Sequence, residues 1–279
     1  MFAPREDFFA LAGPAPAGCA AAEWRARLEL AACYRLFDWL GWAEGIYNHI
    51  TLRLDTPQVD GPHADGAQPV FLINPYGLHY GEVSAANLLK IDSGGRKLDD
   101  SPNSVNAAGL VIHSAVHGAR ADAHCVMHTH TTSVMAVACK QSGLRDDNFY
   151  SAYFKGRVGL HPFEGITTSS DEGPRLVASL GTHPVLLLRN HGVVVVGASI
   201  AAAFEQLWTF QRACDVQLAS DSMAGANLPV APDVLARIGE QAARMTPQGA
   251  GQGELLFYGM LRRAGVTASS ISNLNRIKT

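Results

Sequence analysis

The chain has 279 residues, of which 47% are hydrophobic and 17% charged, and its formal net charge at pH 7 is −3. This composition is typical of a globular protein with a sizeable core, and without a basic surplus nucleic acid is not an expected partner. The five cysteines are odd in number and scattered, which argues against a disulfide framework or a cysteine zinc site. The first residues lack the pattern of a secretory signal, and no apolar run reaches the roughly 18 residues of a membrane span. We therefore expect a cytoplasmic protein with no membrane partner.

The first third of the chain predicts one helix followed by a hairpin. Residues 1–19, rich in Pro, Gly and Ala, indicate a loosely held lead-in. Apolar residues then recur at steps of three and four over residues 20–40, which predicts a helix. Residues 48–54 alternate as a strand does, and residues 70–74 are the expected hairpin partner. The Pro-Tyr-Gly that ends at Gly77 predicts a turn.

The middle of the chain alternates helical and strand patterns. Residues 103–120 predict a helix with an asparagine as its N-cap. A short strand is expected over 125–129, and a helix over 132–139. Two aliphatic, β-branched runs, 185–188 and 193–196, predict two buried strands joined by Arg-Asn-His-Gly.

The last third of the chain predicts helices. A long amphipathic pattern covers 199–219, and two further helices are expected over 231–245 and 253–264. Because no composition break divides the chain, we expect a single α/β domain over residues 20–265, followed by a polar tail over 266–279.

Histidine is the residue that carries the chemical signal. His128 and His130 are two residues apart in a strand pattern, so both imidazoles should leave the same face. A pair of neutral imidazoles suits Zn²⁺, Fe²⁺ or Mn²⁺. His191 is the best candidate for a third ligand, because it lies in the turn between two apolar strands, where Gly192 would let the backbone bend. Three histidines and an open position are the pattern of a catalytic metal site.

A second histidine pair lies on the predicted helix of residues 103–120. His113 and His117 are four residues apart, but Ser114 stands where a zinc protease would carry its glutamate. The plain structural interpretation is that one packs in the helix interface and the other is exposed. The alternative is that His113 supports the site. His49, beside Asn48, could reach the site if the first hairpin lies against it.

Five segments together resemble the class II aldolase/adducin family, over about residues 23–218. They are Glu44-Gly-Ile-Tyr-Asn-His-Ile-Thr51, Leu72-Ile-Asn-Pro-Tyr-Gly77, Ile112-His-Ser-Ala-Val-His117, Val126-Met-His-Thr-His130 and Leu188-Arg-Asn-His-Gly192. The Asn-His-Ile and Asn-Pro-Tyr-Gly pieces are most similar to the adducin-like bacterial branch, which includes decarboxylases and iron-dependent oxidative members.

This resemblance implies a fold, a metal and an assembly. The implied fold is a three-layer α/β/α domain with a central, mostly antiparallel sheet. His128, His130 and His191 would hold one divalent ion per subunit, with zinc as the first expectation and iron or manganese as alternatives. The implied assembly is a homotetramer with sites between subunits. The family's aldolases use the metal as a Lewis acid on a small-molecule substrate.

The sequence departs from those aldolases at the start of the helix that carries His113. Counted back from His128, the Ser-Ser-Glu of the aldolases, which serves phosphate binding and proton transfer, falls on Ala107, Ala108 and Gly109. A phosphorylated sugar is therefore a poor substrate expectation, as is a reaction that needs a carboxylate base there. Four residues match other walls of the substrate site: Asn48, Asn74, Gly77 and His113.

Three functions follow as hypotheses. The first is a metal-dependent lyase, of decarboxylase or aldolase type, acting on a small non-phosphorylated oxo or hydroxy acid, with Tyr47, His49 and Tyr153 as candidates for proton transfer. The second is an iron-dependent oxygenase on the same three histidines. The third is a non-catalytic scaffold resembling the head of adducin. A scaffold has no chemical need for three histidines, which favours the enzymes.

Overall fold

The computed structural model describes residues 4–54, 69–167, 169–244 and 249–272. Its centre is a seven-stranded sheet in the order β3-β2-β1-β4-β7-β6-β5. The strands are β1 (His49–Leu54), β2 (Val70–Ile73), β3 (Leu89–Asp92), β4 (Cys125–Thr129), β5 (Val158–His161), β6 (Val185–Leu188) and β7 (Gly192–Gly197). Five of the six neighbouring pairs are antiparallel, and only β5 and β6 run parallel. The predicted α/β fold with a mostly antiparallel sheet is confirmed.

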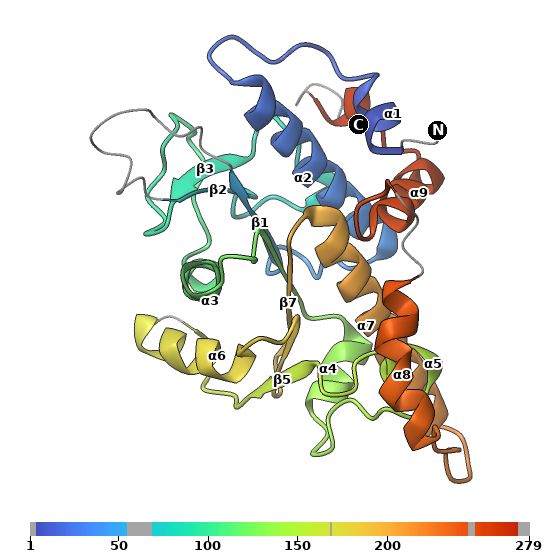
Figure 1. The fold of residues 1–279 in the computed structure, drawn as a ribbon. Coiled ribbons are helices and arrows are strands. Elements are labelled where there is room, and N and C mark those ends of the chain that lie inside the picture. The colour runs from blue at the N-terminus through green and yellow to red at the C-terminus, as the bar shows by residue number, and fades with distance from the viewer. Residues whose placement is uncertain (1–3, 55–68, 168, 245–248, 273–279) are drawn as a thin grey trace.

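Helices cover both faces of this sheet (Figure 1). On one face lie α2 (Ala21–Leu40), α4 (Thr132–Ala138), α7 (Ile200–Asp221) and α9 (Glu254–Ala264); on the other lie α3 (Ala107–Ala119) and α6 (Gly173–Leu180). Strand alternation explains both layers, since Met127 of β4 joins the core beneath α2 and α7 while its neighbour Val126 joins the core beneath α3 and α6. The side chains of the α3 face are the ones that matter for the site.

Several elements were not predicted from the sequence. The strands β3 and β5 and the helix α6 are four to eight residues long, so each offers few repeats of its pattern. The short helix α5 (Phe149–Ala152) was also not predicted, whereas α8 (Pro232–Ala243) agrees with the helix expected over 231–245. The helix α3 begins at Ala107, four residues later than the predicted start at residue 103.

The described parts of both terminal segments contain a short helix that the sequence did not predict; residues 1–3 and 273–279 lie outside the described residues. The lead-in of residues 1–19 contains helix α1 (Pro4–Phe9), and the Phe9 ring is buried in the core beneath α2 and α9. The tail contains helix α10 (Ala268–Ile271), whose Ile271 carbonyl accepts a hydrogen bond from the backbone N–H of Ala85. In both places an apolar side chain within a polar or Pro-rich stretch docks on the core. The division into one domain over residues 20–265 stays a prediction.

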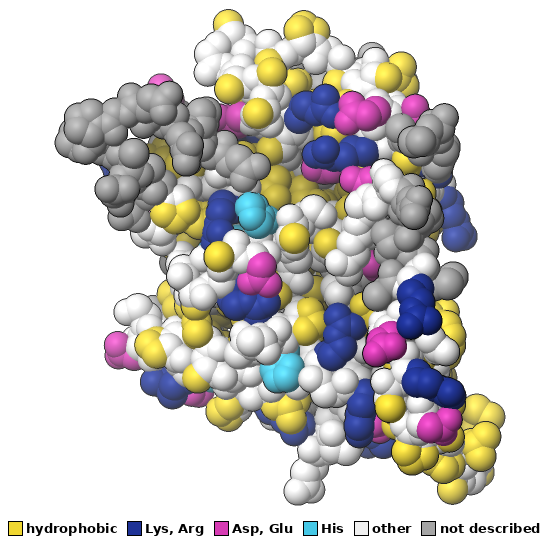
Figure 2. Space-filling view, viewed as in Figure 1, with side chains coloured by type: hydrophobic (Ala, Val, Ile, Leu, Met, Phe, Trp, Pro, Cys, Tyr) yellow, Lys and Arg dark blue, Asp and Glu magenta, His cyan; other side chains and the backbone are white. Residues whose placement is uncertain are grey.

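None of the helices in the described part of the chain has the length and apolar character that crossing a membrane requires. Over the face drawn in Figure 2, Lys and Arg side chains lie interspersed with Asp and Glu. Charged side chains of the described residues form ion pairs such as Arg120–Asp122 and Arg145–Asp221.

Candidate metal centre

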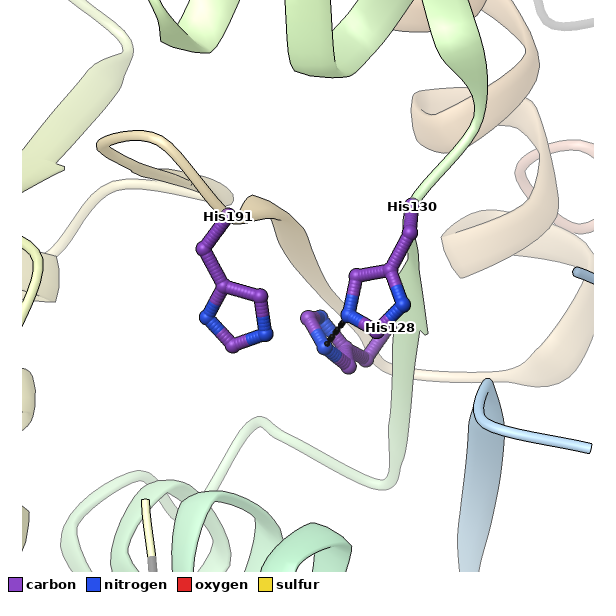
Figure 3. A group of neighbouring side chains, drawn as sticks. All are labelled: His128, His130 and His191. Carbon is purple, nitrogen blue, oxygen red and sulfur yellow. Dashed lines mark hydrogen bonds between the residues drawn. The ribbon is translucent and has the colours of Figure 1, made fainter. Parts of the chain in front are cut away.

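The two neighbouring strands β4 and β7 bring three histidines together. His128 is on β4, His130 follows the end of that strand, and His191 lies in the turn between β6 and β7. Their ligand nitrogens all lie within 4.8 Å of one another. Figure 3 shows the three rings converging from the strand end and the turn. The predicted juxtaposition of the H-x-H pair with His191 is therefore present in the structure.

The turn that carries His191 is built differently from the prediction. The residue with a left-handed backbone is Asn190, with φ of 55°, and not Gly192. Gly192 is needed for a different reason, because a Cβ on it would lie 2.4 Å from the carbonyl oxygen of Thr129 and 2.9 Å from Cδ2 of His130. Glycine thus lets β7 approach β4 closely enough for His191 to face His130.

The electrostatics of the cluster favour neutral imidazoles. Burial, and after it the neighbouring imidazoles, lower the pKa of His128 well below its usual range and that of His130 to about 4. Burial also lowers the pKa of His191, against the opposing charge of Glu172. Neutral imidazole is the form that binds a metal ion.

The hydrogen bonds of His128 test whether the three residues fit a metal. Its Nδ1 donates to the carbonyl oxygen of Val193 at 2.9 Å, so its Nε2 carries a lone pair and faces Nε2 of His130 at 2.7 Å. Two nitrogens bound to one tetrahedral zinc ion lie roughly 3.4 Å apart, about 0.7 Å more than this. Because His130 is partly exposed, a rotation of its ring would be the change needed to bind the ion. The donor set therefore fits a borderline divalent ion.

The cluster is open on one side. His128 is buried, whereas His130 and His191 are partly exposed. The ring of Phe163, itself 54% exposed, lies 6.3 Å from that of His191. A small molecule could thus reach the exposed side of the cluster, next to an aromatic ring.

A second group of polar residues lies beside the cluster, between β1 and α3. His49 pairs directly with His128 across the antiparallel strands, and their rings are 4.9 Å apart. Nδ1 of His49 is hydrogen-bonded to Nε2 of His113 at 2.8 Å. Thr51 Oγ1 is in turn hydrogen-bonded to Nδ1 of His113 at 2.5 Å and to Nε2 of His117 at 2.7 Å. All four side chains are buried. The interpretation that one of His113 and His117 is exposed was wrong, because the buried hydroxyl of Thr51 gives both a partner.

Asn48 and Asn74 lie at the ends of β1 and β2. The Asn48 amide donates to the Trp42 carbonyl at 2.7 Å, while its own Oδ1 is buried without a partner. The Tyr34 hydroxyl lies 2.9 Å from Oδ1 of Asn74 and accepts the backbone N–H of that residue at 3.2 Å. Gly77 has φ of 95° in the turn that follows. Of these predicted substrate-binding residues, Asn48 retains an acceptor without a protein partner, whereas Asn74 is tied to Tyr34.

The two tyrosines proposed for proton transfer have different surroundings. Tyr47 is 62% exposed, just before β1. Tyr153 lines a cavity of about 1150 Å³ beside Trp208, and none of the three clustered histidines lines it. The guanidinium of Arg157 stacks over the Tyr153 ring at 4.2 Å. The structure does not bring Tyr153 into the histidine cluster.

Sequence reasoning missed two features near the site. Thr51 shares a strand face with His49, two residues away, and that spacing could have indicated it. His161, at the end of β5, is buried with its Nδ1 3.0 Å from Ser179 Oγ and its Nε2 3.3 Å from Glu172. The Glu172 contact joins β5 to the segment before α6, and strand periodicity cannot predict it.

Comparison with known proteins identifies the family. The family model described as the Class II Aldolase and Adducin N-terminal domain matches residues 28–218. The chain is 39% identical, over 87% of its length and 90% of the relative's, to a Pseudomonas aeruginosa protein provisionally named an aldolase class 2 protein. It is 38% identical to alpha-adducin of Rattus norvegicus over 81% of its own length and 30% of adducin's.

Solved structures agree with this. The crystal structure of an aldolase II superfamily protein from Pseudomonas syringae is 37% identical and has a TM-score of 0.79, covering 90% of this chain and 96% of that one. The L-fuculose 1-phosphate aldolase of Glaciozyma antarctica, 23% identical with a TM-score of 0.70 and 93% of each chain covered, shares the fold. This chain is a member of the class II aldolase/adducin family.

Proposed function

We propose that this protein is a metal-dependent lyase that breaks a C–C bond in a small, non-phosphorylated oxo or hydroxy acid. The observation that supports the proposal most is the convergence of His128, His130 and His191, three neutral imidazoles with an accessible side. Zinc is the first candidate for the ion, followed by iron and manganese. A bound ion would polarise a substrate carbonyl or hydroxyl and stabilise the negative charge that develops when the bond breaks.

The protein residues would divide the remaining work. The Val193 carbonyl holds the ring of His128 in one orientation, which fixes one side of the site. His130 and His191 border the exposed side, where substrate would enter. Asn48 offers a buried acceptor that a substrate hydroxyl could satisfy.

The exclusion of phosphorylated substrates follows from the start of α3. Ala107, Ala108 and Gly109 lack the hydroxyls and the carboxylate that the family's sugar-phosphate aldolases carry there. Loss of CO₂ leaves the bonding electron pair on carbon without a base removing a proton from carbon, so a decarboxylase tolerates this loss. An aldolase-type cleavage needs a proton acceptor for a substrate hydroxyl. Tyr47, His49 and Tyr153 are the candidates for proton transfer.

A scaffold is the second candidate, because alpha-adducin is 38% identical over most of this chain. An iron-dependent oxygenase on the same histidines is the third. We also expect a homotetramer in the cytoplasm, with sites near subunit boundaries.

One assay series separates these candidates. The chelator-treated protein is reloaded with Zn²⁺, Mn²⁺ or Fe²⁺ and incubated with a panel of 2-oxo and hydroxy acids, with and without oxygen. Release of CO₂ or an aldehyde in the absence of oxygen supports the lyase. Product formed only with iron and with oxygen uptake indicates the oxygenase, and no turnover with any metal indicates the scaffold. L-fuculose 1-phosphate is the negative control, since efficient cleavage of it would contradict the non-phosphorylated substrate class.

A further inference from the structure

The ring of His49 fills the space that a side chain at position 109 would need. A Cβ built on Gly109 would lie 2.4 Å from Cδ2 and 2.6 Å from Nε2 of His49. Position 109 is the one at which the sugar-phosphate aldolases carry their carboxylate. His49 and a carboxylate at position 109 are therefore mutually exclusive in this packing, and the imidazole stands where the carboxylate would begin.

We propose that His49 replaces the missing carboxylate as the proton acceptor of the site, and that Thr51, His113 and His117 hold it in the tautomer whose Nε2 is unprotonated. The proposal rests on the lyase function proposed above and identifies the residue that accepts the proton in that reaction. His49 is the catalytic residue in this scheme, and the other three are positioning residues.

The tautomer follows from a chain of hydrogen bonds with one fixed end. Nδ1 of His117 lies 2.7 Å from the Ala123 carbonyl oxygen, which can only accept, so Nδ1 carries the proton and Nε2 of this neutral ring does not. The Thr51 hydroxyl must then donate to Nε2 of His117, which uses its only proton. Thr51 Oγ1 therefore accepts from Nδ1 of His113.

The same reasoning fixes the tautomers of His113 and then of His49. Because the proton of His113 is on Nδ1, its Nε2 is an acceptor, and the partner within 2.8 Å is Nδ1 of His49. His49 must donate there, so its own Nε2 is left with a lone pair. Five groups in a row, beginning with a backbone carbonyl, allow one arrangement of protons when all the rings are neutral.

Burial supports that neutral state. Desolvation lowers the pKa of His117 to about 3 and lowers that of His113 well below its usual range. The chain ends at the Ala123 carbonyl, which has no proton to give, so it cannot deliver protons to solvent. Its effect is to orient the His49 ring and fix its tautomer.

This arrangement selects one of the two lyase reactions. A neutral His49 with a bare Nε2 accepts a proton and has none to give there at the outset. In an aldol-type cleavage, Nε2 takes the proton of a substrate hydroxyl, the O–H electrons form the new C=O bond, and the C–C bonding pair stays on the departing carbon. His49 then returns the proton to that carbon. The preferred substrate is thus a hydroxy acid in which one of the two carbons joined by the breaking bond carries a hydroxyl.

Nitrogen NMR of histidine side chains tests the tautomer without any substrate. The full chain is labelled with ¹⁵N-histidine and studied metal-free and zinc-loaded, and the signals of His49 are identified by their loss in His49→Asn. The wild type should show a proton on Nδ1 and none on Nε2 of His49. Thr51→Val removes the hydroxyl at nearly constant volume and should move the proton to Nε2, whereas Thr51→Ser should preserve the wild-type pattern.

A second variant keeps the test decisive if Thr51→Val does not fold. His117→Phe keeps a ring but removes the acceptor of the Thr51 proton, which frees the hydroxyl to donate to His113 and should reverse the same tautomers. A wild-type His49 protonated on Nε2, or tautomers unchanged in both variants, would overturn the proposal. A third outcome separates the two claims. If NMR finds the expected tautomer but the protein turns over no substrate, the hydrogen-bond chain stands and only the lyase function is contradicted.

Discussion

Each histidine near the site owes its role to the partner of its other ring nitrogen. His128 donates to a backbone carbonyl and so presents a bare nitrogen to His130 and His191. His49 reaches the same state through His113. In both, a protein carbonyl at the far end selects which nitrogen faces the site.

The packing of Gly109 against His49 gives the first prediction. Gly109→Ala should lower the free energy of unfolding by about 1–3 kcal/mol, because its Cβ would overlap a buried ring held by hydrogen bonds. Urea unfolding measures this. Gly118→Ala is the matched control, since Gly118 lies in the same helix with nothing within 4 Å of its Cβ, and alanine there should stabilise by up to about 1 kcal/mol.

A second substitution should partly reverse the destabilisation by Gly109→Ala. Gly109→Ala combined with His49→Ala should recover part of the stability that Gly109→Ala loses alone, because the overlapping ring is gone. Equal effects of alanine at positions 109 and 118 would contradict the close contact.

At the scale of elements, the β1–α3 contact is polar where the rest of that layer is apolar. Thr51 on the strand meets His113 and His117 on the helix, while the neighbouring α3 side chains Ile112 and Val116 pack on Val126 and β7. A buried contact of this kind is stable only while its imidazoles stay neutral. The stability of the fold should therefore depend on pH through α3.

His117 isolates this dependence. Its pKa is about 3 in the folded protein and about 6.5 in the unfolded chain, so unfolding takes up one proton at pH values between these two. Stability is thus full above pH 6.5 and is lost as the pH falls. Between pH 7 and pH 5 this one group should cost about 2 kcal/mol.

Urea unfolding of the metal-free protein at pH 7, 6 and 5 checks the prediction. His117→Asn keeps a donor for the Ala123 carbonyl but cannot titrate, so its stability should fall by about 2 kcal/mol less than that of the wild type over this range. An identical pH dependence in the two proteins would show that His117 is not held neutral in the fold.

The sequence predicted the parts of the site that depend on local pattern. The two-residue spacing of His128 and His130 predicted that their side chains lie on the same side, because side chains alternate along a strand. The valine run of β7 is buried on both faces of the sheet, as expected. The link from His49 to His113 could not be predicted, because it depends on the register of β1 against β4 and on how α3 rotates over the sheet. The position of Tyr153 relative to the cluster could not be predicted either, since spacing along the sequence does not say which face of the sheet a segment covers.

At the scale of the whole molecule, the open side of the metal centre is a candidate contact surface between subunits. Phe163 and Ile166, which follow β5, are 54% and 81% exposed, and Phe163 lies beside His191. A neighbouring subunit of a homotetramer could cover these side chains. Sedimentation equilibrium should give four copies per particle, and Ile166→Asp should shift the equilibrium towards smaller species if this surface is an interface. A wild-type monomer at micromolar concentration would contradict the assembly.

The metal content of the purified protein tests the central claim most directly. Elemental analysis of the wild type should find about one divalent ion per chain, as expected for a single three-histidine site. His128→Ala and His191→Ala should each lose that ion while remaining folded, and His183→Ala, which alters a histidine outside the cluster, should retain it. A folded wild type that carries no metal and does not take up Zn²⁺, Fe²⁺ or Mn²⁺, or an ion that persists in both cluster variants, would contradict the metal centre.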